Sequence, residues 1–231
     1  MIYLIFAEAA LEVIPKVLWN KPKIKEYANK KGKPPSSILL DASNLYYVMK
    51  ELNDFNKRGR PDIIHFSLLY ALGSELNIRG KLKVYVHTLN DQIICLDSKV
   101  RLPRNYTRFT GLMEQLFERK VITDQDGNKL LSISSMKLNK LLAGLGLEQV
   151  IILQEGKPIL PTSLIDDKIR REEDLAFIIG AFPHGNYRQE TLELSSLRYS
   201  LSEYLLDTWN VTGKLLAICE LLMLTGNTKL T

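Results

Sequence analysis

The sequence is poor in the two residue types that most often bind metal ions or act as nucleophiles. Among 231 residues there are two cysteines and three histidines. Cys95 and Cys219 lie far apart in separate apolar runs, and His65, His87 and His184 show no spacing typical of metal ligands. We therefore expect no disulfide framework, no metal site and a reducing location, namely the cytoplasm.

The sequence also lacks the short motifs of several enzyme classes. There is no GxSxG, HExxH or GxxxxGK[ST] pattern. Gly144 and Gly146, in LLAGLGLEQV, come nearest to a dinucleotide-binding fingerprint, but they follow an expected helix and precede an expected strand. Because that fingerprint needs the reverse order, we interpret these glycines as a helix C-cap and a turn.

No apolar run of the sequence is long enough to cross a bilayer. The N-terminal stretch IYLIFAEAALEVIP is interrupted by Glu8 and Glu12, and no basic residue precedes it. We predict a buried strand and a turn there, and no signal or membrane segment. Internal repeats and low-complexity segments are also lacking, so we treat residues 1–231 as a single domain.

What the sequence does contain is an ordinary globular composition with a basic balance. Hydrophobic residues make up 45% and charged residues 25% of the chain. Lys and Arg number 31 against 26 Asp and Glu, which gives a net charge of +5. This balance favours a polyanionic partner without requiring one.

In the first third of the chain, polar segments that predict loops alternate with apolar segments. Residues 20–37 are rich in lysine, proline and glycine, so we predict an exposed basic loop. SILLDA (37–42) predicts a buried strand, and Pro61 begins a segment with apolar residues at helical spacing.

The middle of the chain predicts a hairpin followed by a helix. KLKVYVHT (81–88) and QIICLD (92–97) alternate as paired strands do, and three residues separate them. Apolar residues from Phe109 onward recur at helical spacing, so we predict a helix that begins near Thr107. We expect residues 80–135 to form an extension of the domain.

The last hundred residues contain short apolar runs that are each followed by a loop signal. QVIILQ (149–154), LAFIIG (175–180) and TLELSS (191–196) predict buried parallel strands with functional loops at their carboxyl ends. Ser200 and Glu203 have capping-box spacing, which predicts that the final helix begins at residue 200 and runs toward Gly226.

The stretch VRLPRNYTRF places three arginines close together. Because Pro103 disfavours a regular helix, we predict that Arg101, Arg104 and Arg108 stand on an extended loop and reach several phosphates. Tyr106 is a candidate for stacking on an unpaired base. The alternative is a solvated arginine loop with Tyr106 at the edge of the core.

A second candidate site is formed by two loops near the C-terminus. Gly180 directly precedes the segment AFPHGNY (181–187), and Gly185 lies within it. The segment SSLRYSLS (195–202) follows a few residues later. Glycines let a backbone approach a ligand closely, so the loops suit a small polar molecule held by main-chain groups. Simple strand-to-helix turns are the alternative.

Asp62 is a carboxylate with two arginines close before it in RGRPD. It is a candidate catalytic residue because of this basic neighbourhood. The alternative is structural, since an acid in the first turn of a helix stabilises the helix dipole by roughly 0.3 to 1 kcal/mol.

Five stretches together resemble one known family. They are GRPDIIHFSLLYAL, RGKLKVYVHT, VRLPRNYTRFTGLMEQL, LAFIIGAFPHG and YSLSEYLLDTWNV, and they cover most of residues 36–212 in order. The chain resembles the ribosome-assembly pseudouridine N1-methyltransferases of archaea and eukaryotes, a branch of the SPOUT superfamily.

The resemblance implies an α/β SPOUT fold: a mostly parallel sheet flanked by helices, with a C-terminal trefoil knot. It implies a homodimer with S-adenosylmethionine as methyl donor, and other ribosome-assembly proteins are possible further partners. It also implies methylation of ring nitrogen N1 of a pseudouridine in a hairpin loop of small-subunit rRNA.

The resemblance also assigns roles to residues. Arg60 and Asp62 match the family's RPD motif, so Asp62 becomes the catalytic candidate and Arg60 joins the RNA-binding arginines. The residues expected to hold the cofactor fall on three loops: Leu153, Gln154, Gly180, Ala181, Gly185, Leu197, Tyr199, Leu201 and Ser202.

The chain departs from the family pattern at two places. Ser200 and Glu203 replace Pro and Ala of a YPLSA segment, and Asn44, Leu45 and Tyr46 stand where His or Asp residues are usual. An RNA-binding assembly factor with weak or dispensable methylation is therefore the alternative function. Glu203 favours that alternative, whereas the glycines of the AFPHG loop favour the enzyme.

Overall fold

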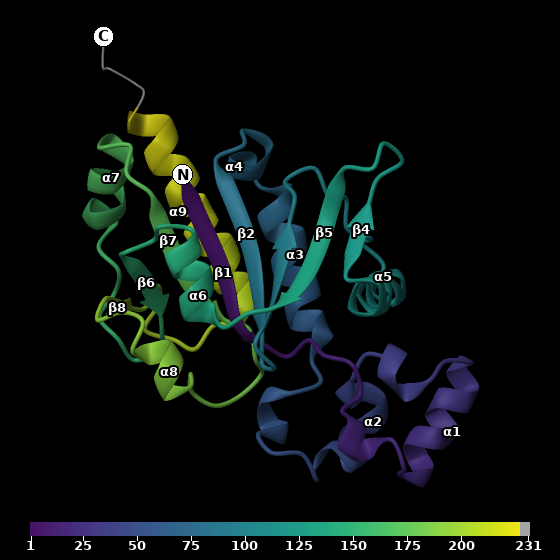
Figure 1. Ribbon diagram of the computed structural model, residues 1–231. Helices are drawn as coiled ribbons and strands as arrows, with labels where there is room; N and C mark the ends of the chain where they lie inside the picture. Colours follow the sequence, from purple (N-terminus) through teal and green to yellow (C-terminus); the bar gives the residue numbers. More distant parts are fainter. Residues whose placement is uncertain (227–231) are drawn as a thin grey trace.

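The computed structural model describes residues 1–226, with side chains described as far as residue 223. An eight-stranded mixed sheet with the order β4-β5-β3-β2-β1-β7-β6-β8 forms the centre of this part of the chain (Figure 1). The strands are β1 (Ile2–Ala9), β2 (Leu82–Thr88), β3 (Gln92–Leu96), β4 (Val121–Thr123), β5 (Lys129–Ser135), β6 (Val150–Leu153), β7 (Leu175–Gly180) and β8 (Arg198–Tyr199). Neighbours from β2 to β8 pair in parallel, and β3, β5 and β4 continue the sheet in antiparallel pairs.

Helices lie on both faces of the sheet and beyond one edge. They are α1 (Pro22–Lys31), α2 (Ala42–Met49), α3 (Pro61–Gly73), α4 (Glu75–Ile78), α5 (Tyr106–Arg119), α6 (Leu138–Gly144), α7 (Thr162–Arg170), α8 (Gln189–Leu192) and α9 (Thr208–Gly226), with short 3-10 helices at Lys16–Leu18, Pro35–Ser37 and Phe55–Lys57. The structure thus has the predicted α/β class, with a mostly parallel sheet flanked by helices.

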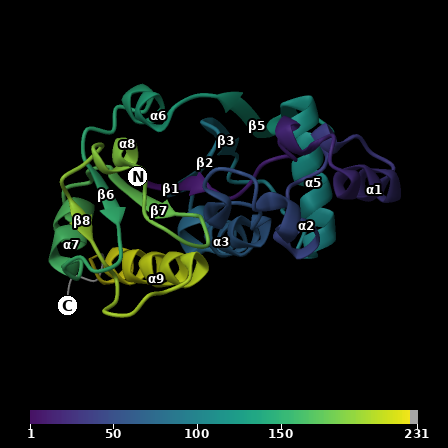
Figure 2. The ribbon, with the colours of Figure 1, turned by 90° about the horizontal axis from the view of Figure 1, so that it is seen from below.

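Two hydrophobic cores lie on opposite faces of the sheet. Side chains alternate along β1, so that Leu4 and Phe6 join one core while Ile5 and Ala7 join the other. The first core packs against α3, α5, α7 and α9, and the second against α6 and α8 (Figure 2). Burial on both faces explains why the central strands are nearly continuous apolar runs.

A third, smaller core lies beyond the sheet. It is built by α1, α2 and the segments around them, from Ile14 to Leu52. Leu45 and Met49 of α2 point into it, and Ile24 and Ala28 of α1 do the same. This unit sits beside the carboxyl end of β1 (Figure 1).

The hairpin and its neighbours join the main sheet. β2 and β3 are antiparallel as predicted, and the helix after the arginine stretch begins at Tyr106 with Asn105 as its N-cap. The segment 80–135, which we expected as an extension of the domain, supplies β2 and the antiparallel part of the same sheet.

Two predictions near the N-terminus are wrong. Residues 22–31 within the predicted basic loop 20–37 form α1, because Pro22 fits the first helical turn and Gly32 closes the end in a left-handed conformation (φ 62°). The lysines stay largely exposed. SILLDA is buried but forms only an isolated bridge, between Leu39 and Val13, in place of a strand.

Two predictions near the C-terminus also fail. TLELSS lies in α8 and the turn after it, although QVIILQ and LAFIIG contain parallel strands as predicted. The final helix begins at Thr208, eight residues later than the capping-box spacing indicated. Ser200 instead pairs with Ile159 in a parallel bridge, and its hydroxyl donates to the carbonyl of Ser202 (2.6 Å). No helix in the described part is long and apolar enough to cross a membrane.

Candidate functional site

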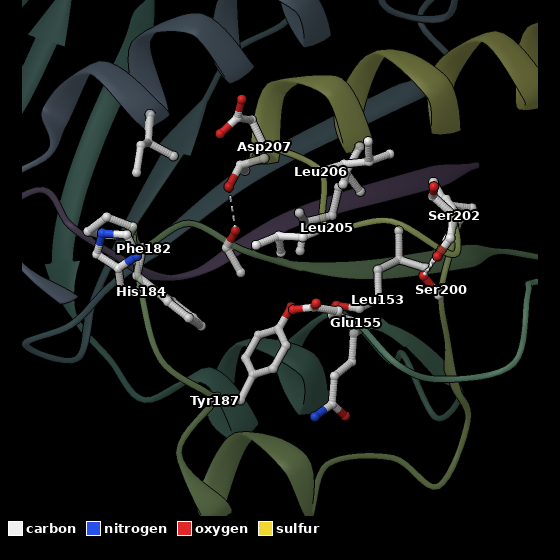
Figure 3. A pocket seen from close by; sticks show the side chains of 18 of the residues that line it. Leu153, Glu155, Phe182, His184, Tyr187, Ser200, Ser202, Leu205, Leu206 and Asp207 are labelled. Carbon is white, nitrogen blue, oxygen red and sulfur yellow. Dashed lines mark hydrogen bonds between the residues drawn. The ribbon is translucent and has the colours of Figure 1, made fainter. Parts of the chain in front are cut away.

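A cavity of about 540 Å³ opens at the carboxyl ends of β6 and β7. Its walls come from residues 153–156 after β6, from residues 179–187 at the end of β7, and from residues 200–209 around the start of α9 (Figure 3). Arg60 and Ile63, at the start of α3, complete the wall. Carboxyl ends of parallel strands are the usual place for ligands in open α/β sheets.

Hydrogen bonds fasten the three wall segments to one another. The hydroxyl of Tyr187 donates to the carbonyl of Leu153 (2.8 Å), which joins the loop after β7 to the end of β6 (Figure 3). Thr208, the first residue of α9, donates its hydroxyl proton to the carbonyl of Gly180 (2.8 Å). Burial raises the pKa of Tyr187, so its hydroxyl stays a donor.

Glycine is required at two points of the loop after β7. Gly185 has a φ of 97°, a conformation that side chains rarely adopt. A Cβ added at Gly180 would lie 3.0 Å from the ring of Phe182 and 3.2 Å from the ring of Tyr187. The loop therefore keeps its backbone, with no side chain, close to the cavity at both places.

One polar atom in the wall has no partner in the described residues. The side-chain oxygen Oε1 of Gln154 is buried and accepts no hydrogen bond. Buried polar atoms are nearly always paired, so this oxygen fits a ligand that donates a hydrogen bond. The described residues contain no cluster of three or more His, Cys, Asp or Glu placed to hold a metal ion.

Most of the predicted cofactor residues line this cavity. Those on its wall are Leu153, Gln154, Gly180, Gly185, Leu201 and Ser202. Ala181, Leu197 and Tyr199 are not on the wall. Their backbone groups bond to neighbouring segments instead: Ala181 pairs with Ala7 and Ala10, and the carbonyls of Leu197 and Tyr199 accept from residues 152 and 154.

Several wall residues were missed from the sequence. They are Glu155, Phe182, Tyr187, Leu205, Leu206 and Asp207, with others nearby. Placing the helix start at residue 200 hid the loop 200–207, which leads into α9. A usable signal was Asp207, a good capping residue at the end of LLD and directly before the first helical residue. Glu203 is exposed and does not line the cavity, so it no longer supports the alternative function.

A buried ion pair connects the loop after β7 to the end of β1. Glu8 at the end of β1 is fully buried, with a φ of 53°, and its carboxylate accepts from Lys57 Nζ (2.8 Å) and from the backbone N–H of Arg188 (2.7 Å). Lys57 Nζ lies 4.6 Å from the centre of the Phe182 ring, and its chain packs against Gly185. The segment before α3 is thereby joined to the loop that lines the cavity.

The predicted catalytic residue forms a two-pronged ion pair with its neighbour. Arg60 Nε donates to Asp62 Oδ1 (2.8 Å), and Arg60 NH2 donates to Asp62 Oδ2 (2.7 Å). Asp62 raises the pKa of the Arg60 guanidinium, so the cation on the cavity wall is firmly charged. Asp62 itself is not on the wall.

Arg101 and Arg104 stand on an extended loop, as predicted, whereas Arg108 lies in the first turn of α5, so its placement on the loop is wrong. Arg101, Arg104 and Arg108 are exposed, and their side chains have no hydrogen bond or ion pair with the side chains described, which end at residue 223. The loop itself is fixed, because His65 Nε2 bonds to the carbonyl of Pro103 (2.7 Å) and Asn105 caps α5. Three guanidinium groups thus stand on a rigid support.

Tyr106 lies at the edge of the core, as in the alternative interpretation. Its hydroxyl donates to Asp41 Oδ2 (2.6 Å), and its ring lies 6.0 Å from the ring of His65. Burial and the nearby Asp41 carboxylate raise the pKa of Tyr106. The residue therefore joins α5 to the N-cap of α2, and its ring is half-buried.

Comparisons with known proteins give one consistent result. Residues 4–220 match the family model described as EMG1/NEP1 methyltransferase. A protein of Staphylothermus marinus named ribosomal RNA small subunit methyltransferase Nep1 is 40% identical over 95% of each chain. A protein of the same name from Thermococcus sibiricus is 38% identical over 94% of this chain and 96% of its own length.

A solved structure has the same arrangement of elements. The crystal structure of Archaeoglobus fulgidus Nep1 bound to S-adenosylhomocysteine superposes with a TM-score of 0.85 at 38% sequence identity. The match covers 95% of this chain and 97% of the other. The likeness therefore extends over nearly the whole chain.

Proposed function

Because the chain belongs to the EMG1/NEP1 methyltransferase family, we propose that it transfers a methyl group from S-adenosylmethionine to small-subunit rRNA. The acceptor in this proposal is nitrogen N1 of a pseudouridine in a hairpin loop. The reaction belongs to the biogenesis of the small ribosomal subunit. An rRNA substrate is consistent with the cytoplasmic location expected from the sequence.

The cavity at the ends of β6 and β7 is the observation that carries the proposal. Glycines bring the backbone close to it, and the unpaired oxygen of Gln154 offers an acceptor for an amino or hydroxyl group. Leu153, Leu201 and Leu206 give it apolar walls. These features suit a nucleoside-containing cofactor, and the neighbouring structure from Archaeoglobus fulgidus is described as bound to S-adenosylhomocysteine.

The chemistry explains why the acceptor is pseudouridine. Its base is attached to the sugar through carbon, which leaves a free N1–H that uridine lacks. In the proposed step, N1 bonds to the methyl carbon while the bond from that carbon to sulfur breaks, with its electron pair going to the sulfur. The N1 proton leaves to water or to a carboxylate, so charge and atoms balance.

Positioning is the main task left to the protein. S-adenosylmethionine, when bound, supplies a methyl group made electrophilic by the positive sulfur. The wall residues need to hold N1 in line with that methyl group at about 3 to 3.5 Å and to exclude water. Arg60 on the wall suits a phosphate or a base oxygen of the target nucleotide, since its guanidinium keeps N–H groups beyond those that donate to Asp62.

We propose that Asp62 acts on the same step as the catalytic carboxylate, by orienting or accepting the N1 proton through water. Its contacts with Arg60 support an orienting role, because both carboxylate oxygens already accept hydrogen bonds from that side chain. Arg101, Arg104 and Arg108 are proposed to hold the RNA backbone, since they are exposed and unpaired in the described chain.

The homodimer and the trefoil knot also belong to this proposal. Phe66, Tyr70 and Trp209 form an apolar face across α3 and α9; Phe66 and Tyr70 are 46% and 55% exposed. A second copy of the chain would cover such a face.

Support for the knot is the path of the chain from β7 through α8 to the edge strand β8, and back to α9, which packs in the same core as β7.

The test of the proposed function is transfer of a labelled methyl group to a short hairpin RNA with a pseudouridine in its loop. Tight binding of the hairpin without transfer would move the assignment to the RNA-binding assembly factor.

A further inference from the structure

Helix α2 carries two adjacent tyrosines that the core does not use. Tyr47 is 83% exposed and Tyr46 is 48% exposed. Their rings meet edge to face, with centroids 5.7 Å apart. Lys50 places its ammonium 5.2 Å from the centre of the Tyr46 ring and 5.5 Å from that of Tyr47. The result is a small aromatic surface with a cation beside it.

Helix α2 lies between the two parts of the proposed RNA site. At its start, the N–H of Ala42 donates to the carbonyl of Gly59 (2.9 Å), directly before Arg60 of the cavity wall. The N-cap Asp41 accepts from Tyr106 (2.6 Å), at the start of the helix that carries Arg108. Seen from the carboxyl end of β1, α2 lies between α3 and α5 (Figure 2).

The packing of α2 fixes which side chains face outward. Leu45 and Met49 pack in the third core. The Met49 side chain also lies against Gly59, where it would clash with an added Cβ atom. Ser43, Asn44, Tyr46, Tyr47 and Lys50 remain exposed. The inward face of α2 is therefore held by packing, and the tyrosines stand on its outward face.

The exposed cations of the proposed RNA site favour a polyanion. Arg101, Arg104 and Arg108 are exposed without partners in the described chain, and the one acid directly after Lys50, Glu51, is paired with Lys21. Tyrosine faces stack on unpaired bases, and lysines and arginines beside them hold the phosphates. This combination is typical of surfaces that bind single-stranded RNA.

We propose that Tyr47, with Tyr46 and Lys50, is a stacking platform for an unpaired loop nucleotide next to the one that enters the cavity. This inference rests on the proposed function and assigns the substrate a contact outside both the cavity and the arginine loop. Tyr106 is poorly suited to that task, because its hydroxyl is engaged and its ring is half-buried. Protein docking is less suited, because polar Ser43 and Asn44 border the rings on α2.

The experiment measures binding of a short hairpin RNA to the full chain by fluorescence anisotropy. Tyr47→Ala should weaken binding by roughly 5- to 150-fold, the range for one stacked base, with an unchanged dependence on salt. Tyr47→Phe keeps the ring and should bind within about twofold of the wild type. Ile78→Ala is the matched control, since Ile78 is 78% exposed on α4 at the opposite end of the sheet (Figure 1).

A second set of hairpins identifies the contact. Each hairpin of this set lacks one loop base, so that it has an abasic site at one position. The target nucleotide keeps its base in every hairpin. Removal of one of these bases should weaken binding to the wild type and leave binding to Tyr47→Ala unchanged, because the abasic site and the substitution abolish the same stacking interaction.

The outcomes separate this inference from the function on which it rests. If the wild type binds and methylates the hairpin but Tyr47→Ala binds equally well, the platform is wrong and the enzyme stands. If the wild type does not bind the hairpin, the proposed function fails as well. Equal weakening by Tyr47→Ala and Tyr47→Phe would overturn stacking in favour of a contact by the hydroxyl.

Discussion

At the scale of single residues, the buried pair Glu8 and Lys57 is expected to contribute strongly to stability. Glu8 is fully buried, and Lys57 Nζ is the one cation that meets its carboxylate in the described residues. Lys57→Met should lower the free energy of unfolding by about 3 to 5 kcal/mol, because it leaves an unpaired buried charge. Chemical denaturation measures this change.

The matched control for Lys57 is a surface pair. Lys23→Met breaks an exposed contact with Glu26 and should change stability by less than about 1 kcal/mol. Adding Glu8→Gln to Lys57→Met should restore most of the stability, since a neutral amide tolerates burial better than a carboxylate. Equal effects of Lys57→Met and Lys23→Met would show that the buried pair does not hold the loop.

Asp62 offers a second prediction at this scale. Asp62→Asn should lower kcat by about 10²-fold or more while the affinity for RNA changes little, because the carboxylate is proposed to act on the N1 proton or to orient Arg60. Single-turnover methyl transfer and RNA binding measure the two quantities separately. Equal reduction of both, or a decrease in stability alone, would leave Asp62 with only its role in the first turn of α3.

At the scale of elements, the arginine loop before α5 should act on affinity and not on the chemical step. Removing one arginine–phosphate interaction should flatten the plot of log affinity against log salt by roughly 0.7 to 0.9. Arg104→Ala should show this change with kcat nearly unchanged. Arg79→Ala is the control, because Arg79 lies outside the arginine loop and is paired with Glu75. The same slope for Arg104→Ala and the wild type would remove Arg104 from the RNA site.

The elements also show where sequence patterns suffice. The hairpin β2 to β3 and the helix α5 were predictable, since each has clear periodicity and, for α5, a capping residue in Asn105. The helix α1 was not, because only Ile24 and Ala28 of its ten residues are buried and lysines dominate the rest. Local signals were misleading at Ser200, where a capping-box spacing occurs in a segment that tertiary contacts hold as a loop.

The candidate site was less predictable than the fold for a physical reason. The wall is formed mainly by residues from three loops that are separate in the sequence, and its glycines give no side-chain motif to search for. The resemblance to a family located Gly180, Gly185 and Ser202 on that wall. Tyr187 lies in the AFPHGNY loop that was singled out, but it was not named individually. Wall residues such as Asp207 became visible only when the true start of α9 was known.

At the scale of the whole molecule, the proposed cofactor and RNA sites lie next to one another on one side of the fold. The cavity, Arg60, helix α2 and the arginine loop follow one another from the ends of β6 and β7 to the start of α5. A hairpin loop bound along this edge would place one nucleotide in the cavity while its neighbours meet α2 and the arginines. The proposal therefore requires both the right base and an RNA loop around it.

The most direct test of the account is methyl transfer from labelled S-adenosylmethionine to two hairpins that differ at one loop position, pseudouridine or uridine. The account predicts label on the pseudouridine hairpin alone, because only that base offers a free N1–H. Label on both hairpins would contradict the assignment of N1 as acceptor, and binding of both without label would contradict the assignment of the chain as the enzyme.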